Sequence, residues 1–404
     1  MTGSSSGRAL RIAYLATHPI QYQAPLLRLV AAEPGIELKA FFRSPMGLKR
    51  YIDPGFGQAI AWDTPLLDGY AHEFLPALGD PLRVTPYLRP LNYGLARRLG
   101  AGHFDVLWVH GYARVFHLAA MLTAKRLGLK LLLRDEPTSI SKPRGGLRRV
   151  AKRGIYGTLA CLVDGALTIG SLNRQYYLDQ GFPAAKLFPV PYAVDNAHFR
   201  AGAEQAAANR AAFLAALGLP ADPPRIVFAG KLTPIKAPEV LLEAFARIEA
   251  VKPHLCFVGD GPLRGLLEER ATALGVRDRV VFAGFRNQRE LPAFYDAADV
   301  FVLPSRREPW GLVVNEAMNA GRAIVVSDQV GAGPDLVRPG ENGAIFPAGD
   351  AAALARALGD ILATPGRAAA MGRRSLTIIE GWSFREDIAG LKQALAGIGL
   401  PLPA

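Results

Sequence analysis

The stretch Ser305–Gly321 reads SRREPWGLVVNEAMNAG and lies between two apolar segments, Val300–Pro304 and Ala323–Ser327, that are typical of buried strands. It predicts a helix that opens at Trp310–Gly311 and runs through Ala320. A strand, a turn, a helix and a further strand in succession form the repeating unit of a parallel α/β sheet. We therefore expect a doubly wound fold around this stretch.

Two carboxylates, Glu308 and Glu316, bracket the predicted start of this helix. Between them the first turn, with Gly311 and Leu312, presents backbone N–H groups that have no partner inside the helix and suit a phosphate. Glu308 could accept from hydroxyls beyond the phosphates, and Glu316 from a ribose. The stretch suits a sugar joined to a nucleoside through a diphosphate, although two solvated glutamates on an ordinary helix would have the same spacing.

The second half of the chain repeats the strand and helix alternation with great regularity. Most of its apolar runs are followed by a polar turn and a helical pattern, which predicts a parallel sheet with helices on both faces. The predicted strands are RIVFAG (225–230), HLCFVGD (254–260), RVVFAG (279–284), VFVLPS (300–305), AIVVSD (323–328) and GAIFP (343–347).

Two further turns of this half carry candidate ligand contacts. After the first strand come Gly230, Lys231 and Lys236, a glycine that lets backbone approach a ligand and two cations that suit a diphosphate. After the third strand comes Phe285, whose ring could hold a base. These residues would share the ligand with the Glu308 stretch.

The first half shows the same alternation, with predicted strands at 11–16, 36–42, 105–110 and 129–133. The carboxyl ends of such strands line the ligand cleft of an α/β sheet. We therefore expect His18, Gln21, His110 and Glu136 to face the cleft. His18 could instead cap a helix or lie in a loop, and His110 could be a satisfied core residue.

The aromatic and proline-rich loop 51–67 of the first half is too long to be a simple connection, and we expect it to shape a substrate pocket. The following strands, 163–169 and 187–190, complete this half, and a helix from 200 to 218 leads into the second.

Length and charge divide the chain in the same way. At 404 residues and 50% apolar content, two domains that each bury a core are expected. Residues 1–195 hold 24 Lys and Arg against 13 Asp and Glu, and the remainder hold 23 against 22. We predict a disordered tail over 1–8, domains over 9–195 and 196–382, and a helix over 383–404 that crosses back to the first domain.

A basic stretch, SKPRGGLRRVAKR, covers 141–153 and contains no acid. If it is helical from Leu147 onward, Arg148, Arg149, Lys152 and Arg153 would suit anionic lipid headgroups. A solvated positive face is the alternative. Nucleic acid is not expected as a partner, because no recognised nucleic-acid-binding motif accompanies the stretch.

Cysteine content and the termini indicate the compartment. Only Cys161 and Cys256 occur, which fits a reducing environment, and the first residues lack the apolar segment of a signal peptide. We expect a cytoplasmic protein, possibly peripheral on the inner face of the membrane.

Together with VPYAVDNAHF (190–199) and GDGP (259–262), these turns resemble the retaining nucleotide-sugar glycosyltransferases of family 4, which have the GT-B fold of two facing Rossmann-like domains. The resemblance is dense over 185–350 and mainly architectural over 8–184. It implies a first domain that binds the acceptor and a second that binds the nucleotide sugar.

The resemblance also assigns roles to single residues. It implies that Lys231 and Lys236 are the diphosphate cations, that Glu308 contacts the donor sugar and Glu316 the ribose, and that His110 lies near the transferred sugar. Three departures stand out: Lys231 replaces the usual arginine, the stretch THPIQYQAP lacks the usual glycine pair, and GAGPD (331–335) replaces a GG-x-P-E pattern.

Missing motifs narrow the expected chemistry. No two aspartates stand two residues apart, so the D-x-D metal clamp of other glycosyltransferases is missing, and no G-x-G-x-x-G supports a dehydrogenase. We expect a glycosyltransferase that needs neither metal nor cofactor, retains the anomeric configuration and uses a glycan, lipid-linked or small-molecule acceptor. The alternatives are a nucleotide-sugar epimerase or other GT-B enzyme, and a non-catalytic protein that binds nucleotide sugars or membranes.

Overall fold

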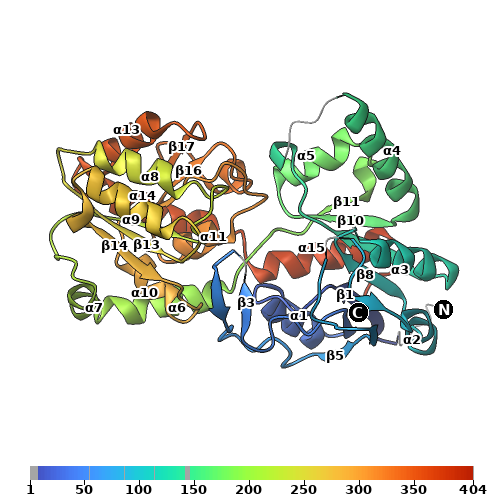
Figure 1. The fold of residues 1–404 in the computed structure, drawn as a ribbon. Helices are drawn as coiled ribbons and strands as arrows, with labels where there is room; N and C mark the ends of the chain where they lie inside the picture. Colours follow the sequence, from blue (N-terminus) through green and yellow to red (C-terminus); the bar gives the residue numbers. More distant parts are fainter. Residues whose placement is uncertain (1–7, 54, 86, 113, 142–145, 404) are drawn as a thin grey trace. The chain divides into compact units, whose positions relative to one another are not determined.

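The computed structural model describes residues 8–53, 55–85, 87–112, 114–141 and 146–403, and from 141 to 152 it describes no side chains. The chain forms two compact units (Figure 1). Unit 1 comprises the described residues of Met1–Arg50, Thr64–Pro191 and Phe384–Ala404, and unit 2 comprises those of Tyr51–Asp63 and Tyr192–Ser383. The disordered tail predicted for 1–8 lies outside the described residues, apart from Arg8.

Unit 1 is built on a seven-stranded sheet in the order β11-β10-β9-β8-β1-β2-β5. All neighbouring strands in it run parallel. The strands are β1 (Leu10–Ala16), β2 (Ile36–Phe42), β5 (Ala71–Phe74), β8 (Val106–His110), β9 (Lys130–Arg134), β10 (Gly165–Thr168) and β11 (Leu187–Pro189), with a short antiparallel pair of β6 (Ala77–Leu78) and β7 (Leu91–Asn92) beside them.

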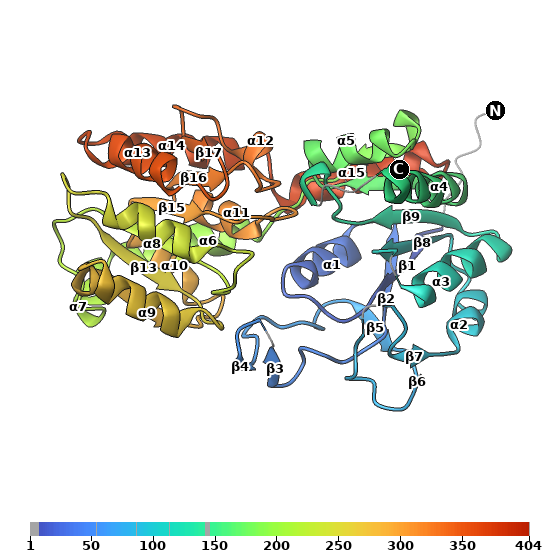
Figure 2. The same ribbon diagram turned by 45° about the horizontal axis from the view of Figure 1, so that its top comes forward.

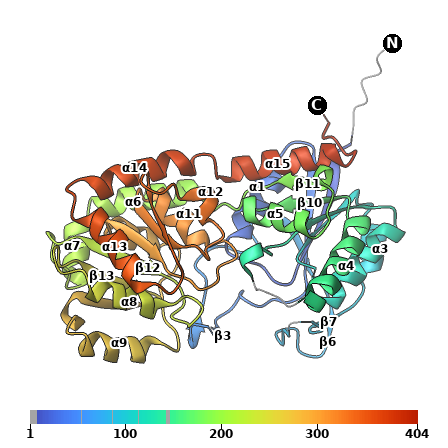
Figure 3. The ribbon, with the colours of Figure 1, turned by 90° about the horizontal axis from the view of Figure 1, so that it is seen from above.

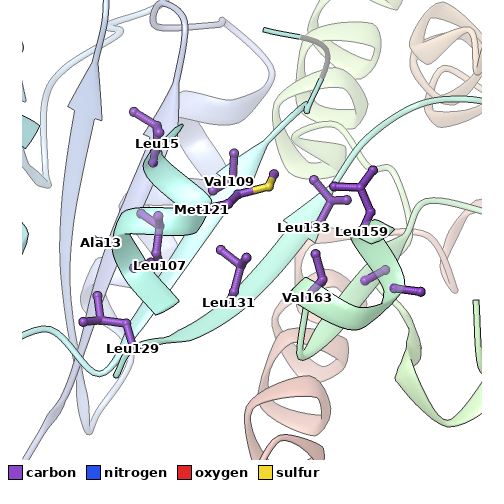
Figure 4. Packing of buried hydrophobic residues seen from close by; sticks show 14 of the residues in the cluster. Ala13, Leu15, Leu107, Val109, Met121, Leu129, Leu131, Leu133, Leu159 and Val163 are labelled. Carbon is purple, nitrogen blue, oxygen red and sulfur yellow. The ribbon is translucent and has the colours of Figure 1, made fainter. Parts of the chain in front are cut away.

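Helices cover both faces of this sheet, as the near-continuous apolar strands require. On one face Leu107 and Val109 of β8 pack in a buried cluster with Leu131 of β9 and Met121 of α3 (Figure 4). On the other face α1 packs against β2 (Figure 2). The helices are α1 (Gln23–Ala32), α2 (Leu95–Ala101), α3 (Val115–Arg126), α4 (Gly146–Leu162), α5 (Ser171–Asp179) and α15 (Phe384–Gly397), with 3-10 turns at Ser139–Ser141 and Ala184–Lys186.

The last helix, α15, belongs to unit 1 although it follows the last helix of unit 2 in the sequence. It lies against β10, β11 and α1 (Figure 3). Gly390 allows this approach, because a Cβ atom there would lie 2.1 Å from the Pro189 carbonyl oxygen. The fully buried guanidinium of Arg134, at the end of β9, donates to Asp387 of α15 at 2.8 Å.

Unit 2 is built on a six-stranded sheet in the order β14-β13-β12-β15-β16-β17, again with parallel neighbours. Its strands are β12 (Arg225–Ala229), β13 (His254–Val258), β14 (Val280–Gly284), β15 (Val300–Leu303), β16 (Ala323–Ser327) and β17 (Gly343–Phe346). Each lies within a strand predicted from an apolar run. The predicted fold class, two doubly wound α/β domains, is confirmed.

The helices of unit 2 also form two layers. Helix α8 contacts α9 and α13, whereas α6 contacts α10 and α11, and α11 contacts α14 (Figure 1). The helices are α6 (Asn196–Ala207), α7 (Arg210–Ala216), α8 (Pro238–Ala246), α9 (Arg264–Ala273), α10 (Leu291–Asp296), α11 (Leu312–Asn319), α12 (Gly333–Leu336), α13 (Ala351–Leu362) and α14 (Arg367–Ile379), with a 3-10 turn at Arg277–Arg279.

The structure corrects two predicted helices. The single helix expected over 200–218 is divided into α6 and α7, and α6 begins earlier because the Asp195 carboxylate caps it by accepting from the His198 backbone N–H at 3.0 Å. Helix α11 begins at Leu312, since Gly311 has the left-handed φ of 98° that ends the preceding turn. A Cβ atom at Gly311 would also lie 2.9 Å from Leu303.

The structure also differs from the predicted domains in one segment. The sequence places the whole of 9–195 in the first domain, whereas the structure groups Tyr51–Asp63 with unit 2. This segment holds a short antiparallel pair, β3 (Tyr51–Asp53) and β4 (Gln58–Ile60), and no long apolar run marks where it packs.

The basic stretch lies largely beyond what the structure describes. Its helix is α4, but the side chains of Arg148, Arg149 and Lys152 are outside the described part, and Arg153 is exposed. Within the described ranges, no helix combines the length and the apolar character needed to cross a bilayer.

Candidate functional site

The loops that follow β12, β13 and β15 join at the carboxyl edge of the unit 2 sheet. Backbone hydrogen bonds link them: Gly230 N–H donates to Val258 at 2.9 Å, Leu232 N–H to Asp260 at 2.9 Å, and Arg306 N–H to Ile235 at 2.8 Å. The strand ends that carry the predicted donor contacts therefore form one continuous surface, as expected for a parallel α/β sheet.

Lys236 and Glu308 are neighbours on this surface. The Lys236 ammonium forms an ion pair with Oε2 of Glu308, and Oγ of Ser305 donates to the same oxygen at 3.5 Å. The predicted diphosphate cation and the predicted donor-sugar contact thus lie beside the start of α11. A phosphate and a sugar hydroxyl could each take one of these two groups.

The backbone of Glu308 is held by the loop after β16. Its N–H donates to Gln329 at 2.9 Å, and its carbonyl accepts from the Gly331 N–H at 2.9 Å. A Cβ atom at position 331 would lie 1.9 Å from the Pro309 carbonyl oxygen, so only glycine permits this approach. The GAGPD stretch therefore contains a positioning glycine, Gly331, whose role the sequence did not indicate.

Glu316 lies inside α11 and is fully buried. It accepts a hydrogen bond from the Tyr295 hydroxyl at 2.5 Å, and next to it Asn315 accepts from the Trp310 indole N–H at 3.0 Å. The ribose contact expected of Glu316 stays a prediction. Tyr295 was not predicted, because nothing in the local pattern of α10 shows that it reaches α11.

Lys231 contacts the Tyr51–Asp63 segment. Its ammonium donates to Oδ1 of Asp53 at 2.7 Å and lies 4.9 Å from the centre of the Phe56 ring. Phe285, the predicted base contact, packs edge-on against Phe56 and Trp62, with ring centres 4.9 Å and 6.0 Å apart. The loop expected to shape a substrate pocket in the first domain thus lies against two predicted donor contacts of unit 2.

The Asp53 carboxylate is ionised in this setting. Burial opposes its ionisation, but the hydrogen bond and charge of Lys231 and the backbone N–H groups of Gly55 and Phe56 together hold the pKa of Asp53 below its ordinary value. Its Oδ1 accepts from these two N–H groups at 2.8 Å and 3.1 Å. Asp53 and Lys231 therefore form a charged pair.

In unit 1, His18 and His110 lie at the carboxyl ends of β1 and β8. Burial, followed by the charge of Arg134, lowers the pKa of His110 to about 3, and burial with Arg114 lowers the pKa of His18 to about 4. His110 Nε2 lies 3.9 Å from Oε1 of Glu136. Because the imidazole is neutral near pH 7, this contact is not an ion pair, and His110 can act only as a neutral donor or acceptor.

A third histidine, His117 of α3, joins this cluster and was not predicted. Its Nδ1 lies 3.0 Å from the Gly111 carbonyl oxygen, and burial with Arg43 lowers its pKa to about 3. One buried ring nitrogen on each of His18, His110 and His117 has no hydrogen-bond partner. Gln21, in the turn before α1, is partly buried.

Among the described residues, no three His, Cys, Asp or Glu side chains lie together in a way that could hold a metal ion.

Comparison with solved structures identifies the class of fold. The chain is similar to Anabaena Alr3699/HepE, solved in complex with UDP and glucose, with a TM-score of 0.71 over 96% of this chain and 99% of the other at 16% identity. It is also similar to WaaG, a glycosyltransferase involved in lipopolysaccharide biosynthesis, with a TM-score of 0.66 over 96% and 100% of the two chains at 16% identity. Two parallel-sheet units of this kind define the GT-B fold.

Comparison of sequences identifies the family. Residues 209–376 match the model of the glycosyl transferases group 1. The chain is 31% identical over 393 residues to D-inositol 3-phosphate glycosyltransferase of Streptomyces scabiei, covering 89% of this chain and 82% of the relative. It is 34% identical over 319 residues to the GDP-mannose-dependent alpha-(1-6)-phosphatidylinositol monomannoside mannosyltransferase of Mycolicibacterium smegmatis, covering 75% and 79%.

The chain belongs to the glycosyl transferases group 1 and is a glycosyltransferase that uses a nucleotide sugar.

Proposed function

We propose that this enzyme belongs to family 4 and transfers a sugar from a nucleoside-diphosphate sugar to an acceptor without metal and with retention of the anomeric configuration. The observation that carries the proposal is the Lys236–Glu308 pair beside the start of α11. In this pair a cation that could bind a phosphate lies next to a carboxylate that could accept from a sugar hydroxyl. Cations and helix N–H groups can stabilise a departing diphosphate in place of a metal ion.

The remaining donor contacts follow from the same surface. Lys231 and the N–H groups of Gly311 and Leu312 would contact the diphosphate, and Gly230 would let the backbone approach it. Phe285 would contact the base. Glu316 would contact the ribose and, because it is fully buried, would need to become accessible to do so.

The transfer step follows from retention. The bond between the anomeric carbon and the phosphate oxygen breaks, and the acceptor oxygen forms its new bond on the same face. The acceptor proton goes to the departing phosphate oxygen, so no enzymic base is required. Glu308 would hold the transferred sugar, and neutral His110 would donate an N–H to it.

We infer that the acceptor is lipid-linked or carries phosphate. The names of two relatives include an inositol phosphate and a phosphatidylinositol mannoside, and the basic stretch of unit 1 would favour an anionic acceptor. His18, Gln21 and Glu136 would contact it, because they lie at or just beyond the strand ends of unit 1.

A donor panel tests this function. The full chain is incubated with UDP-, GDP-, ADP- and dTDP-sugars, with and without inositol phosphate or phosphatidylinositol vesicles, and release of nucleoside diphosphate is measured. We expect acceptor-dependent release that EDTA does not change, and NMR of the product should show the anomeric configuration of the donor. Inversion, EDTA sensitivity, epimerisation without an acceptor, or binding without turnover would each contradict the proposal.

A further inference from the structure

The Tyr51–Asp63 segment lies on the carboxyl edge of the unit 2 sheet, where the proposed function places the donor. Its contacts reach the loops after three strands: Asp53 binds Lys231 after β12, Gln58 Nε2 lies 3.5 Å from Asp260 after β13, and Phe56 packs on Phe285 after β14.

The far end of the segment is also held. Asn287 donates from Nδ2 to the Ala61 carbonyl at 2.9 Å, and the Arg289 N–H donates to Asp63 Oδ2 at 3.1 Å. The segment is therefore fixed to unit 2 independently of the Asp53–Lys231 contact.

Asp53 presents its carboxylate to Lys231 in the way that a phosphate oxygen would. One carboxylate oxygen accepts hydrogen bonds from the Lys231 ammonium at 2.7 Å and from the N–H groups of Gly55 and Phe56. The side chain of Asp53 is 12% exposed and that of Lys231 is 38% exposed. The Lys231 side chain packs directly against the backbone at Gly55, since a Cβ atom there would lie 2.5 Å from Lys231 Cδ.

Two anions cannot share this ammonium without cost. A diphosphate on Lys231 would bring a second negative group to within a few ångströms of the Asp53 carboxylate, and like charges at such a separation repel. The Phe56 ring covers part of the same ammonium and leaves less room for both anions.

We propose that Asp53 competes with the donor diphosphate for Lys231 and so sets the affinity of this enzyme for its nucleotide sugar. The inference rests on the proposed function, which assigns Lys231 to the diphosphate. Asp53 is then a donor-site residue supplied by a segment that lies early in the sequence. The Asp53–Lys231 pair opens when donor binds and closes again when nucleoside diphosphate leaves.

The test measures binding of UDP, GDP and ADP to the full chain by calorimetry. Asp53→Asn keeps an oxygen for the Gly55 and Phe56 N–H groups but removes the charge, and we expect about three- to fivefold tighter binding of the preferred nucleotide, as for a partly exposed ion pair. The matched control is Asp63→Asn, which removes one charge from the same segment without touching Lys231. Its affinity should stay within twofold of the wild type.

A double variant assigns the effect to the pair. In a Lys231→Gln background, Asp53→Asn should tighten binding less than it does in the wild-type background, because the repulsion between Asp53 and the diphosphate remains but no ammonium remains to compete for. Unchanged or weaker binding by Asp53→Asn in the wild-type background, with the thermal unfolding midpoint preserved, would overturn the competition, and weaker binding would show that Asp53 orients Lys231. If no nucleoside diphosphate binds the wild type, the proposed function itself fails.

Discussion

Each lysine assigned to the diphosphate already contacts a carboxylate in this structure. Lys231 binds Asp53, and Lys236 binds Glu308. The two carboxylates have different proposed roles. Asp53 competes with the diphosphate for its lysine, whereas Glu308 contacts the transferred sugar. Replacing each lysine by alanine is therefore expected to change nucleotide affinity by a different amount.

Alanine at either lysine should weaken binding of the nucleoside diphosphate by about 1.5–3 kcal/mol, the range of a charge-assisted hydrogen bond. Lys236→Ala should lie at the upper end, because Asp53 competes for Lys231 and already reduces the contribution of that lysine to binding. Titration calorimetry measures both losses. Arg356→Ala, which removes an exposed cation from α13 of the same unit, is the control, and unchanged affinity in both lysine variants would place the diphosphate elsewhere.

Replacing Glu308 and replacing Glu316 should impair different steps, turnover in the first case and nucleotide binding in the second. Glu308→Gln should lower kcat with nucleotide affinity nearly intact, since its proposed contact is to the transferred sugar. Glu316→Gln should mainly weaken binding of the bare nucleotide. Steady-state kinetics and calorimetry separate the two effects, with Glu341→Gln on the surface of unit 2 as the control. The reverse pattern would refute the assignment of roles.

Among the elements, two strand ends and helix α3 of unit 1 carry histidines that burial keeps neutral. Their pKa values, about 4 for His18 and about 3 for His110 and His117, lie below the ordinary value of 6.5 because burial disfavours the charged form. At a pH between these lowered pKa values and 6.5, the unfolded chain binds more protons than the folded one. Stability is therefore fully present above pH 6.5 and falls as the solution becomes more acidic.

For His117 the expected loss is about 1.4 kcal/mol per pH unit below 6.5. Hydrogen exchange of β8 peptides between pH 7 and pH 5, corrected for the intrinsic exchange rate, measures the opening free energy. His117→Gln should flatten this dependence by about that slope, and His103→Asn, at an exposed position, should leave it unchanged. An equal slope in wild type and His117→Gln would show that His117 is not held neutral.

At the scale of the whole molecule, neither unit is a continuous stretch of sequence. Tyr51–Asp63 belongs to unit 2 although the residues on both sides of it belong to unit 1, and Phe384–Ala404 belongs to unit 1 although it follows unit 2 in the sequence. If the chain were cut between Pro191 and Tyr192, the first fragment would lack Phe384–Ala404 of unit 1 and the second would lack Tyr51–Asp63 of unit 2. Donor and acceptor experiments therefore need the full chain.

The excess positive charge is also a property of the whole molecule, since residues 1–195 hold a net charge of +11 of the total of +12. At roughly 1 kcal/mol per base near an anionic surface, the basic stretch could hold the enzyme at a membrane at physiological salt. We expect co-sedimentation with anionic vesicles but not with neutral ones, weakening as salt shortens the Debye length.

Replacing Arg148, Arg149, Lys152 and Arg153 by Gln should abolish this co-sedimentation and leave nucleotide binding unchanged. The control replaces four exposed cations of unit 2, namely Arg247, Arg270, Arg356 and Arg367, by Gln and so changes the net charge equally. Equal recovery in the supernatant with both vesicle types would leave the basic stretch as a solvated face and favour a soluble acceptor.

The sequence by itself determined both doubly wound sheets, the placement of His110 at a strand end, and the positions of Glu308 and Glu316 before and within α11. These features depend on the spacing of apolar residues within short windows, and that spacing is visible locally. The turn after the first strand of the second half suggested Lys231 and Lys236 as cations for a diphosphate, and the resemblance to a family implied the same role.

Only the tertiary structure decided that Asp53 meets Lys231, 178 residues further along the chain, and that Asp387 meets Arg134, 253 residues before it. It also decided the approach of Gly331 to Pro309 and the contact of Tyr295 with Glu316. Such contacts depend on how distant segments pack, which a local apolar period does not encode. The grouping of Tyr51–Asp63 with unit 2 is such a feature, since its large apolar side chains show no period that indicates the sheet they cover.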